Sequence, residues 1–499
     1  MKKILTVGFG LVCSLVSHGQ VQQNPLLPAT WNIKSEELLG FVVELAGDKY
    51  QGRLTGSEGY RQSAEWVAGK FGEWGLLPAL PDKQWMQEFP QPYVTVFPGC
   101  SLVMHLPLNG KDSVDFNYHY FDEYMPGSSS GSGKARAEVI FAGYGISAPE
   151  LGYDDYAGIS VKGKIVLMRP EAPLTPAAGA EKFTPWQPYS THQYKMLNAI
   201  RHGAVGVLYH YGPLANTNND YHQELLVTMV GNRVVEDLFK GTGKGYAEVV
   251  NKITTELNPL SFSTGKVVTI TNVTQFHPEG IGMNVIGLIP GKDQVLKNEV
   301  IIIGGHLDHC GMDWEICPGA NDNASGISVM LGVARTVALS GLRFKRTIVF
   351  IGLGAEEQGL VGAKAYISHP LFSIGKTVGF INLDCVGIGP NLHAGGGENY
   401  PALYKPIDEA NKRYVHRNLT TSYSNNLGRP RSDAAIFMQA GIPSVSFSSS
   451  GGTGAYHTPA DMPSTIWPET LEDLATLLTL AIADLAGITD PPRQETPRD

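Results

Sequence analysis

The second half of the chain alternates short apolar runs with longer helical patterns, and this alternation constrains the fold more than any other feature. The apolar runs cover residues 284–288, 300–304, 347–353 and 378–383, and helical patterns cover about 324–339 and 360–368. Apolar strands that alternate with helices are typical of an α/β fold, in which helices cover both faces of a mostly parallel sheet. Because ligands bind such sheets beyond the carboxyl ends of the strands, the residues after each apolar run are candidates for a functional site.

The rest of the chain predicts an inserted unit. With 499 residues, the chain is longer than the about 250 to 300 residues that one hydrophobic core usually supports. Two amphipathic helices are expected within residues 35–77. Short β-branched runs separated by Gly and Pro occupy about 97–275, and the Ser/Gly run at 128–133 predicts a flexible loop there. We therefore expect residues 20–96 and 276–499 to form the α/β domain and residues 97–275 to form a β-rich insert.

Composition and the N-terminal residues bear on location and partners. The net charge of -9 argues against a nucleic-acid partner. Two lysines, an apolar run over 4–16 and the segment Ser17-His18-Gly19 have the pattern of a secretory signal, so we expect residues 1–19 to be removed and the protein to be periplasmic or extracellular. The apolar run is shorter than the about 20 residues that span a bilayer, which predicts no stable membrane span. Nothing in the sequence indicates the oligomeric state.

Histidine and carboxylate residues follow the apolar runs. His306 and Asp308 end the run that starts at residue 300, and Asp308 is well spaced to hold the histidine ring if that ring binds a metal ion. Asp322 lies in a Gly/Asn/Asp-rich turn that opens a helix, where helix capping is the alternative role. Asp384 ends a later run, and His457 follows the apolar residues 444–447.

An adjacent pair of glutamates, Glu356 and Glu357, comes directly after the run 347–353. Two neighbouring carboxylates repel each other unless a cation is present, and adjacent side chains diverge, so the pair is expected to divide two tasks. We assign Glu357 as a metal ligand and Glu356 as the general base.

The five predicted ligands are His306, Asp322, Glu357, Asp384 and His457. Nitrogen and carboxylate oxygen without thiolate suit a catalytic zinc site rather than a closed structural one. If Asp322 bridges, one ion takes His306 and Asp384 while the other takes Glu357 and His457. Such an arrangement of two Zn2+ leaves room for a shared water between the ions.

These segments resemble the M28 family of zinc aminopeptidases. The resemblance rests on residues 305–309, 319–326, 355–359, 382–384 and 456–461, and it extends to residues 45–76 with Gly52-Arg53-Leu54-Thr55-Gly56-Ser57. It implies that the five predicted ligands hold two zinc ions, that Asp322 bridges them, that Glu356 is the base and that Tyr456 stabilises the oxyanion. The insert resembles a non-catalytic protease-associated (PA) domain in residues 139–156 and 198–206. One departure is Ala434 after Asp433, where relatives often have histidine.

The expected activity is removal of N-terminal residues from peptides that have a free α-amine, which sits near the metals and the acidic cluster. Three alternatives remain open at this point. A carboxypeptidase of the same fold is one, although only about 45 residues follow His457 where some such enzymes carry a long helical domain. A glutaminyl cyclase would use one zinc ion, and a non-catalytic binding protein would have lost ligands that are present here.

Four cysteines follow the signal segment. Cys310 and Cys317 are close enough in sequence to form a disulfide in an oxidising compartment, and we expect this pair to tighten the loop between His306 and Asp322. Cys100 and Cys385 are expected to be free thiols. His309 is expected to have a structural role or to contact a ligand, since the ligand set is complete without it.

Overall fold

The computed structural model describes residues 23–108, 112–423 and 430–488, so the predicted signal segment lies outside the described residues. Its larger sheet has nine strands in the order β1-β15-β19-β16-β20-β23-β21-β22, with β2 also paired to β15. The bounds are β1 Leu77–Pro78, β2 Met86–Pro90, β15 Ile281–Ile289, β16 Val300–His306, β19 Thr347–Leu353, β20 Thr377–Leu383, β21 Asn391–Gly395, β22 Leu419–Ser422 and β23 Ser444–Ser450. The central strands β19, β16, β20 and β23 are parallel to one another. The predicted α/β fold with a mostly parallel sheet is confirmed.

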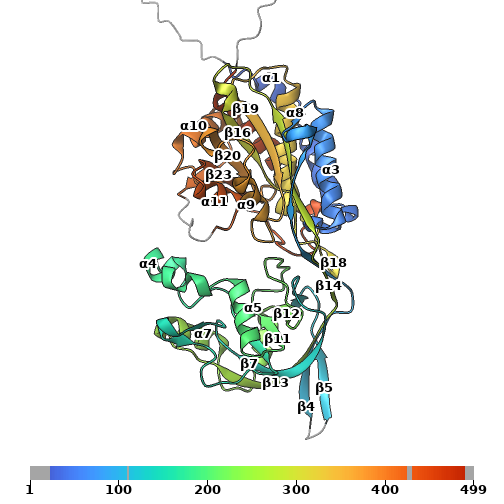
Figure 1. Ribbon diagram of the computed structural model, residues 1–499, viewed down its shortest axis with the longest axis vertical. Helices are drawn as coiled ribbons and strands as arrows, with labels where there is room; N and C mark the ends of the chain where they lie inside the picture. Colours follow the sequence, from blue (N-terminus) through green and yellow to red (C-terminus); the bar gives the residue numbers. More distant parts are fainter. Residues whose placement is uncertain (1–22, 109–111, 424–429, 489–499) are drawn as a thin grey trace, which may run out of the picture.

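Helices cover both faces of this sheet (Figure 1). Alternate residues of a central strand enter different cores, as Ile301 and Ile303 of β16 do on one side and Val300 and Ile302 on the other. The first core contains residues of α2 (Ser35–Leu45), α3 (Glu58–Glu73), α8 (Ser325–Leu339), α10 (Pro401–Ala410) and α12 (Pro468–Ala486). The second contains residues of α9 (Val361–Ser368) and α11 (Asp433–Gln439). Two-sided burial explains why these strands are apolar throughout rather than alternating.

Residues between the N-terminal helices and β15 form a second sheet of eight strands, in the order β5-β4-β13-β7-β10-β11-β12-β6. These strands are β4 Ser101–Leu108, β5 Asp112–Asn117, β6 Tyr124–Pro126, β7 Gly133–Phe141, β10 Ile165–Met168, β11 Gly206–Tyr209, β12 Leu226–Val230 and β13 Phe262–Asn272. Helices α5 (His192–Arg201), α6 (Asn232–Phe239) and α7 (Tyr246–Glu256) belong to the same region, which we call the middle unit (Figure 1). Its assignment as a protease-associated domain stays a prediction.

The expected loop at 128–133 is present between β6 and β7, but its first three serines are buried rather than solvated. Ser128, Ser129 and Ser130 are buried, and the Ser130 hydroxyl accepts a hydrogen bond from the backbone N–H of Val227 at 2.9 Å. The Ser128 hydroxyl donates to Asp313 Oδ2 at 3.0 Å, which ties this segment to the loop after β16. Small polar residues predict a flexible loop only when water makes the hydrogen bonds of their side chains, whereas here protein groups make them.

A small sheet also connects the two parts of the chain. It contains β3 (Tyr93–Val96), β14 (Thr274–His277), β17 (Met312–Asp313) and β18 (Glu315–Ile316), so the strands that enter and leave the middle unit pair with the loop after β16. None of the helices among the described residues is long and apolar enough to cross a membrane.

Candidate metal centre

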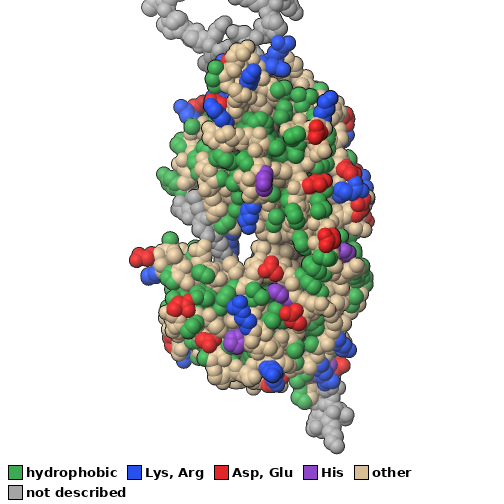
Figure 2. All heavy atoms as spheres, viewed as in Figure 1, with side chains coloured by type: hydrophobic (Ala, Val, Ile, Leu, Met, Phe, Trp, Pro, Cys, Tyr) green, Lys and Arg blue, Asp and Glu red, His purple; other side chains and the backbone are tan. Residues whose placement is uncertain are grey.

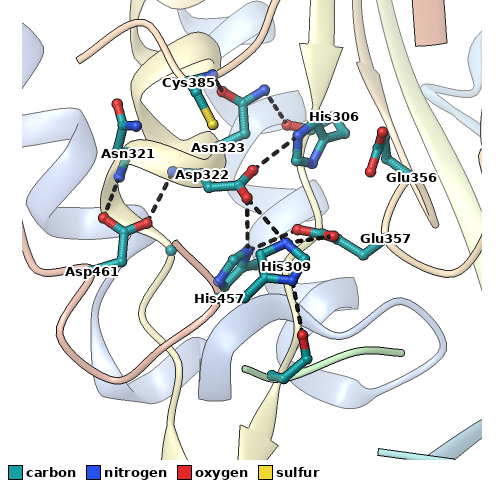
Figure 3. A network of polar contacts seen from close by, with 12 residues as sticks. His306, His309, Asn321, Asp322, Asn323, Glu356, Glu357, Cys385, His457 and Asp461 are labelled. Carbon is teal, nitrogen blue, oxygen red and sulfur yellow. Dashed lines mark hydrogen bonds and ion pairs between the residues drawn. The ribbon is translucent and has the colours of Figure 1, made fainter. Parts of the chain in front are cut away.

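His306 lies at the carboxyl end of β16, with its ring directed at Asp322 (Figure 3). Its Nδ1 lies 3.2 Å from the backbone oxygen of Asp308. A carbonyl oxygen only accepts hydrogen bonds, so Nδ1 carries the proton and the Nε2 lone pair of the neutral ring points the other way. Nε2 faces Asp322 Oδ1 at 3.2 Å and Asp384 Oδ1 at 3.6 Å.

His457 repeats this arrangement from a distant part of the chain. Its Nδ1 lies 2.8 Å from the backbone oxygen of Ala215, in the middle unit, and therefore donates to it. Its Nε2 faces Glu357 Oε2 at 2.9 Å and Asp322 Oδ2 at 3.2 Å. Asp322 thus directs one carboxylate oxygen at each histidine.

Each half of the centre brings a nitrogen lone pair and two carboxylate oxygens together, and such acceptors repel one another unless protons or a cation lie between them. In the metal-free protein, burial lowers the pKa of His306, but Asp322 and Asp384 outweigh it and raise the pKa well above its ordinary value. Burial likewise opposes protonation of His457, while Cys310 and Glu357 raise its pKa. Imidazole nitrogen and carboxylate oxygen are also the donors that zinc takes in catalytic sites, so both halves fit a zinc ion.

Asp308 contributes differently from the prediction. The sequence suggested that its carboxylate holds the His306 ring, yet Oδ1 is 3.8 Å from Nδ1 and the backbone oxygen is the acceptor. The two carboxylate oxygens instead accept the backbone N–H groups of Glu356 and Glu357, at 3.1 and 3.2 Å. Asp308 therefore fixes the turn after β19 that carries both glutamates.

The two glutamates diverge. Glu357 is buried in the histidine cluster, where Oε1 accepts from His309 Nδ1 at 3.0 Å and His457 holds the pKa of Glu357 at about 2 against the effect of burial. Figure 3 places Glu356 apart from the Glu357 carboxylate. Burial raises the pKa of Glu356 well above its ordinary value, as expected of a carboxyl group that exchanges protons rather than one paired with a cation.

A cavity of about 720 Å³ lies over this centre, where the space-filling view is hollowed between the two parts of the molecule (Figure 2). Tyr456 lies in its wall, half exposed, with its ring stacked on His457 at a centroid distance of 3.7 Å. Other lining residues are Gln187, Thr191, Gln193, Tyr211, Asn216 and Asn218 from the middle unit and Glu356, Lys364 and Arg431 from the larger sheet's domain. Both parts of the chain therefore line the cavity.

Arg53 and Asp461 support the centre, although neither is among the predicted site residues. Arg53 is fully buried and donates to the backbone oxygens of Leu45, Leu307, Pro318 and Gly319, which fixes both ends of the loop after β16. Burial lowers the pKa of Arg53 to about 10, and the nearby Asp461 opposes this shift. The carboxylate of Asp461 accepts the N–H groups of Asn321 and Asp322 at 2.9 and 3.0 Å. Their place inside the matched motifs was the one available signal.

Local backbone strain also marks the centre. Ala355, Cys385 and His457 have φ values of 53°, 56° and 56°, in the left-handed region that non-glycine residues rarely adopt. Each such residue costs on the order of 1–3 kcal/mol and persists only where surrounding structure enforces it. All three occupy or adjoin predicted ligand or base positions.

Two further sequence expectations meet the structure here. Asp433 is buried, both carboxylate oxygens lack a hydrogen-bond partner among the described residues, and burial raises its pKa to about 8.

The expected disulfide is wrong, since Cys310 and Cys317 are both free and buried. Sequence spacing permits a small ring, but the two thiols instead lie in an apolar cluster formed largely by the middle unit.

Histidine and carboxylate donors converge at the strand ends of a mostly parallel sheet, an arrangement that suits a metal-dependent hydrolase. Residues 284–482 match the profile of peptidase family M28. This part of the chain is therefore a peptidase family M28 domain, as the five motifs predicted.

Curated relatives carry several names. Leupeptin-inactivating enzyme 1 of Streptomyces exfoliatus is 31% identical over 200 residues, which cover 40% of this chain and 42% of that protein. Aminopeptidase YwaD of Bacillus subtilis is 30% identical over 234 residues, covering 44% and 47%. A probable glutamate carboxypeptidase of Arabidopsis thaliana is 29% identical over 220 residues, covering 41% and 31%. The chain thus spans less than half the length of these relatives.

Solved structures share the fold over nearly the whole chain. An aminopeptidase from Aneurinibacillus sp. strain AM-1 superposes with a TM-score of 0.63 at 22% identity, over 96% of this chain and 99% of that one. A zinc aminopeptidase from Bacillus subtilis has a TM-score of 0.62 at 21% identity, over 92% and 97%. The similarity therefore extends to the middle unit as well as the M28 domain.

Proposed function

We propose that this protein is an exported aminopeptidase that hydrolyses N-terminal residues from peptides with the help of two zinc ions. The observation that carries the proposal is the orientation of two histidines, His306 and His457, whose Nε2 lone pairs face the two oxygens of Asp322 at 3.2 Å each. Asp384 completes one half and Glu357 the other. The relatives named as aminopeptidases agree with this assignment.

The chain's own residues have separate tasks in this mechanism. When bound, zinc supplies Lewis acidity that lowers the pKa of water and polarises the scissile carbonyl. The Glu356 carboxylate accepts the proton of the attacking water and delivers it to the nitrogen of the leaving amine. The Tyr456 hydroxyl donates a hydrogen bond to the carbonyl oxygen as negative charge develops there. Asp308 keeps Glu356 in place through the backbone.

The charge around the centre favours a substrate's ammonium end. Asp322 and Glu357, whose pKa values are lowered by the neighbouring histidines, supply negative charge at the reacting position, which attracts a free α-amine. Among the described residues, the lysine and arginine side chains in the cavity wall are Lys364 and Arg431, and both have partners: Arg431 pairs with Glu171 at 2.8 Å and Lys364 donates to the Gly359 oxygen at 2.7 Å. A carboxypeptidase needs such a cation for the terminal carboxylate, so we place it second.

One peptide series separates the two activities. A hexapeptide with free ends, its N-acetylated form and its C-amidated form are incubated with the protein, and the products are identified by mass spectrometry. We expect sequential loss from the N-terminus of the free and amidated peptides and none from the acetylated one. Chelator should abolish the reaction and zinc restore it. Shortening from the C-terminus, or hydrolysis of the acetylated peptide, contradicts the proposal.

A matched pair of variants tests the assignment of the base. Glu356→Gln should lose turnover, whereas Glu73→Gln, at an exposed position of α3 in an i,i+3 ion pair, should not. Export is tested separately, by sequencing the N-terminus of the mature protein, which we expect to begin at Gln20.

We also propose that residues 97–275 are a protease-associated insert that shapes access to the cavity. Its residues Gln193, Tyr211 and Asn218 lie in the cavity wall, opposite the peptidase residues. Substitution of Tyr211 should change KM between peptides with different N-terminal side chains while leaving the zinc content unchanged.

A further inference from the structure

A thiol lies beside the Glu357–His457 half of the centre. The side chains of His309, Cys310, Glu357 and His457 each offer a potential ligand atom, and these atoms lie within 4.8 Å of one another. All four residues are buried, with exposed fractions of 0%, 2%, 8% and 6%. The M28 ligand pattern uses Glu357 and His457 but assigns nothing to Cys310.

The ring of His457 points to a missing cation in this group. Its Nδ1 is occupied by the Ala215 carbonyl, and its Nε2 is buried without a hydrogen-bond donor among the described residues. Nε2 nevertheless faces a carboxylate oxygen of Glu357 at 2.9 Å (Figure 3). The Cys310 sulfur lies within 4.8 Å of the ligand atoms of both Glu357 and His457. Nitrogen, oxygen and sulfur donors therefore surround one buried position.

We propose that Cys310 is an additional ligand of the metal ion held by Glu357 and His457, so that the two metal positions differ in softness. Imidazole, carboxylate and thiolate together suit Zn2+, Co2+ and Cd2+ rather than hard cations such as Mg2+. On binding, the thiol transfers its proton to solvent and the sulfur lone pair forms the bond to the ion. The inference rests on the proposed two-metal function and adds one ligand to it.

Formation of a disulfide with Cys317 is the reaction that competes with metal binding by the Cys310 sulfur. Cys317 is fully buried in the same apolar cluster as Cys310, and an oxidised pair would no longer present a thiolate. Both cysteines are free in the structure, so the sulfur of Cys310 is available to a metal ion. This second buried thiol also supplies a matched control.

Cobalt substitution tests the ligand directly. The full protein, kept reduced, is stripped of metal and loaded with two equivalents of Co2+. We expect a near-ultraviolet sulfur-to-cobalt charge-transfer band in the unsubstituted protein and in Cys317→Ser, and its complete loss in Cys310→Ser. X-ray absorption of the zinc-loaded unsubstituted protein should show a sulfur shell at about 2.3 Å, with one sulfur for every two zinc ions. This second measurement needs no variant and decides the matter if Cys310→Ser does not fold.

The opposite results overturn the proposal. They are a band that is absent from the unsubstituted protein, a band that persists in Cys310→Ser, or a zinc shell without sulfur. Peptide assays keep this outcome distinct from the proposed function. Hydrolysis with no sulfur ligand leaves the aminopeptidase proposal intact and removes Cys310 from the centre. A sulfur band without hydrolysis keeps Cys310 as a ligand and contradicts the aminopeptidase proposal.

Discussion

Replacing Asp461 by asparagine should weaken both metal positions together. The carboxylate of Asp461 accepts the backbone N–H groups of Asn321 and Asp322, and it thereby fixes the turn that carries the predicted bridging ligand. Asparagine has nearly the same shape but only one acceptor oxygen. In place of the second oxygen it has an NH2 group, which would face a backbone N–H instead of accepting its hydrogen bond. One charge-assisted hydrogen bond is lost, which corresponds to about 1.5–3 kcal/mol.

If this loss falls on the doubly zinc-bound state, the product of the two zinc affinities should decrease by about 10- to 150-fold, with both affinities contributing. Competition with a chromogenic chelator measures the two dissociation constants, and urea unfolding of the metal-free protein measures how much of the cost is structural. Asp473→Asn is the control, since it removes a carboxylate from an ion pair with Arg417 on a partly exposed face of α12. Unchanged zinc affinities, or a loss confined to one ion, would refute the idea that Asp461 positions a bridging ligand.

The remaining predictions concern other parts of the same centre. Glu356→Gln should lower kcat by about 10²- to 10⁴-fold with zinc content unchanged by elemental analysis, and a near-normal kcat would place the base elsewhere. Asp322→Asn should lose both ions, and two retained equivalents would contradict the bridge. Arg53→Met removes a donor from four buried carbonyl oxygens, of which the Gly319 oxygen keeps the N–H of Ala324, at about 1–3 kcal/mol for each one left unsatisfied. Urea unfolding of the metal-free protein should therefore show a larger loss than for Arg335→Met, which removes a partly exposed ion pair between α8 and Glu37. The pKa of His306 is raised in the metal-free protein, so its contribution to stability is present below the ordinary pKa of about 6.5 and is lost as pH rises through the raised value. Zinc must displace this proton, so its apparent affinity should rise about tenfold per pH unit for each displaced proton, and a pH indicator should record proton release near pH 7. Zinc uptake without proton release would contradict this protonation state.

Much of the fold was predictable because its strands are apolar on both sides. Residues 300–304 and 347–353 contact two cores at once, so apolar and polar residues do not alternate along them. This pattern predicts a parallel sheet covered on both faces. The middle unit was harder to predict, because its Ser/Gly segment at 128–130 has a loop-like composition but is buried and paired with distant groups. Composition describes what a residue can do with water, and it does not reveal which protein groups replace that water.

The convergence of His306, Glu357 and Asp384 followed from the sequence alone. Each of them ends or follows a strand of one parallel sheet, and the carboxyl ends of such strands necessarily meet at one edge. The types of donor then predict the class of metal, since imidazole and carboxylate suit zinc.

Only the tertiary structure decided how the ligands are held. The acceptor for His457 Nδ1 is the carbonyl of Ala215, 242 residues earlier in the chain, and the Thr217 hydroxyl donates to the backbone oxygen of Glu357 across 140 residues. Arg53 likewise reaches the carbonyl of Leu307 across 254 residues. The acceptors in these contacts are backbone oxygens, which every residue possesses, so no residue type or spacing marks them. Their partners are selected by the packing of the middle unit and the N-terminal helices against the sheet, which exists only once the chain has folded.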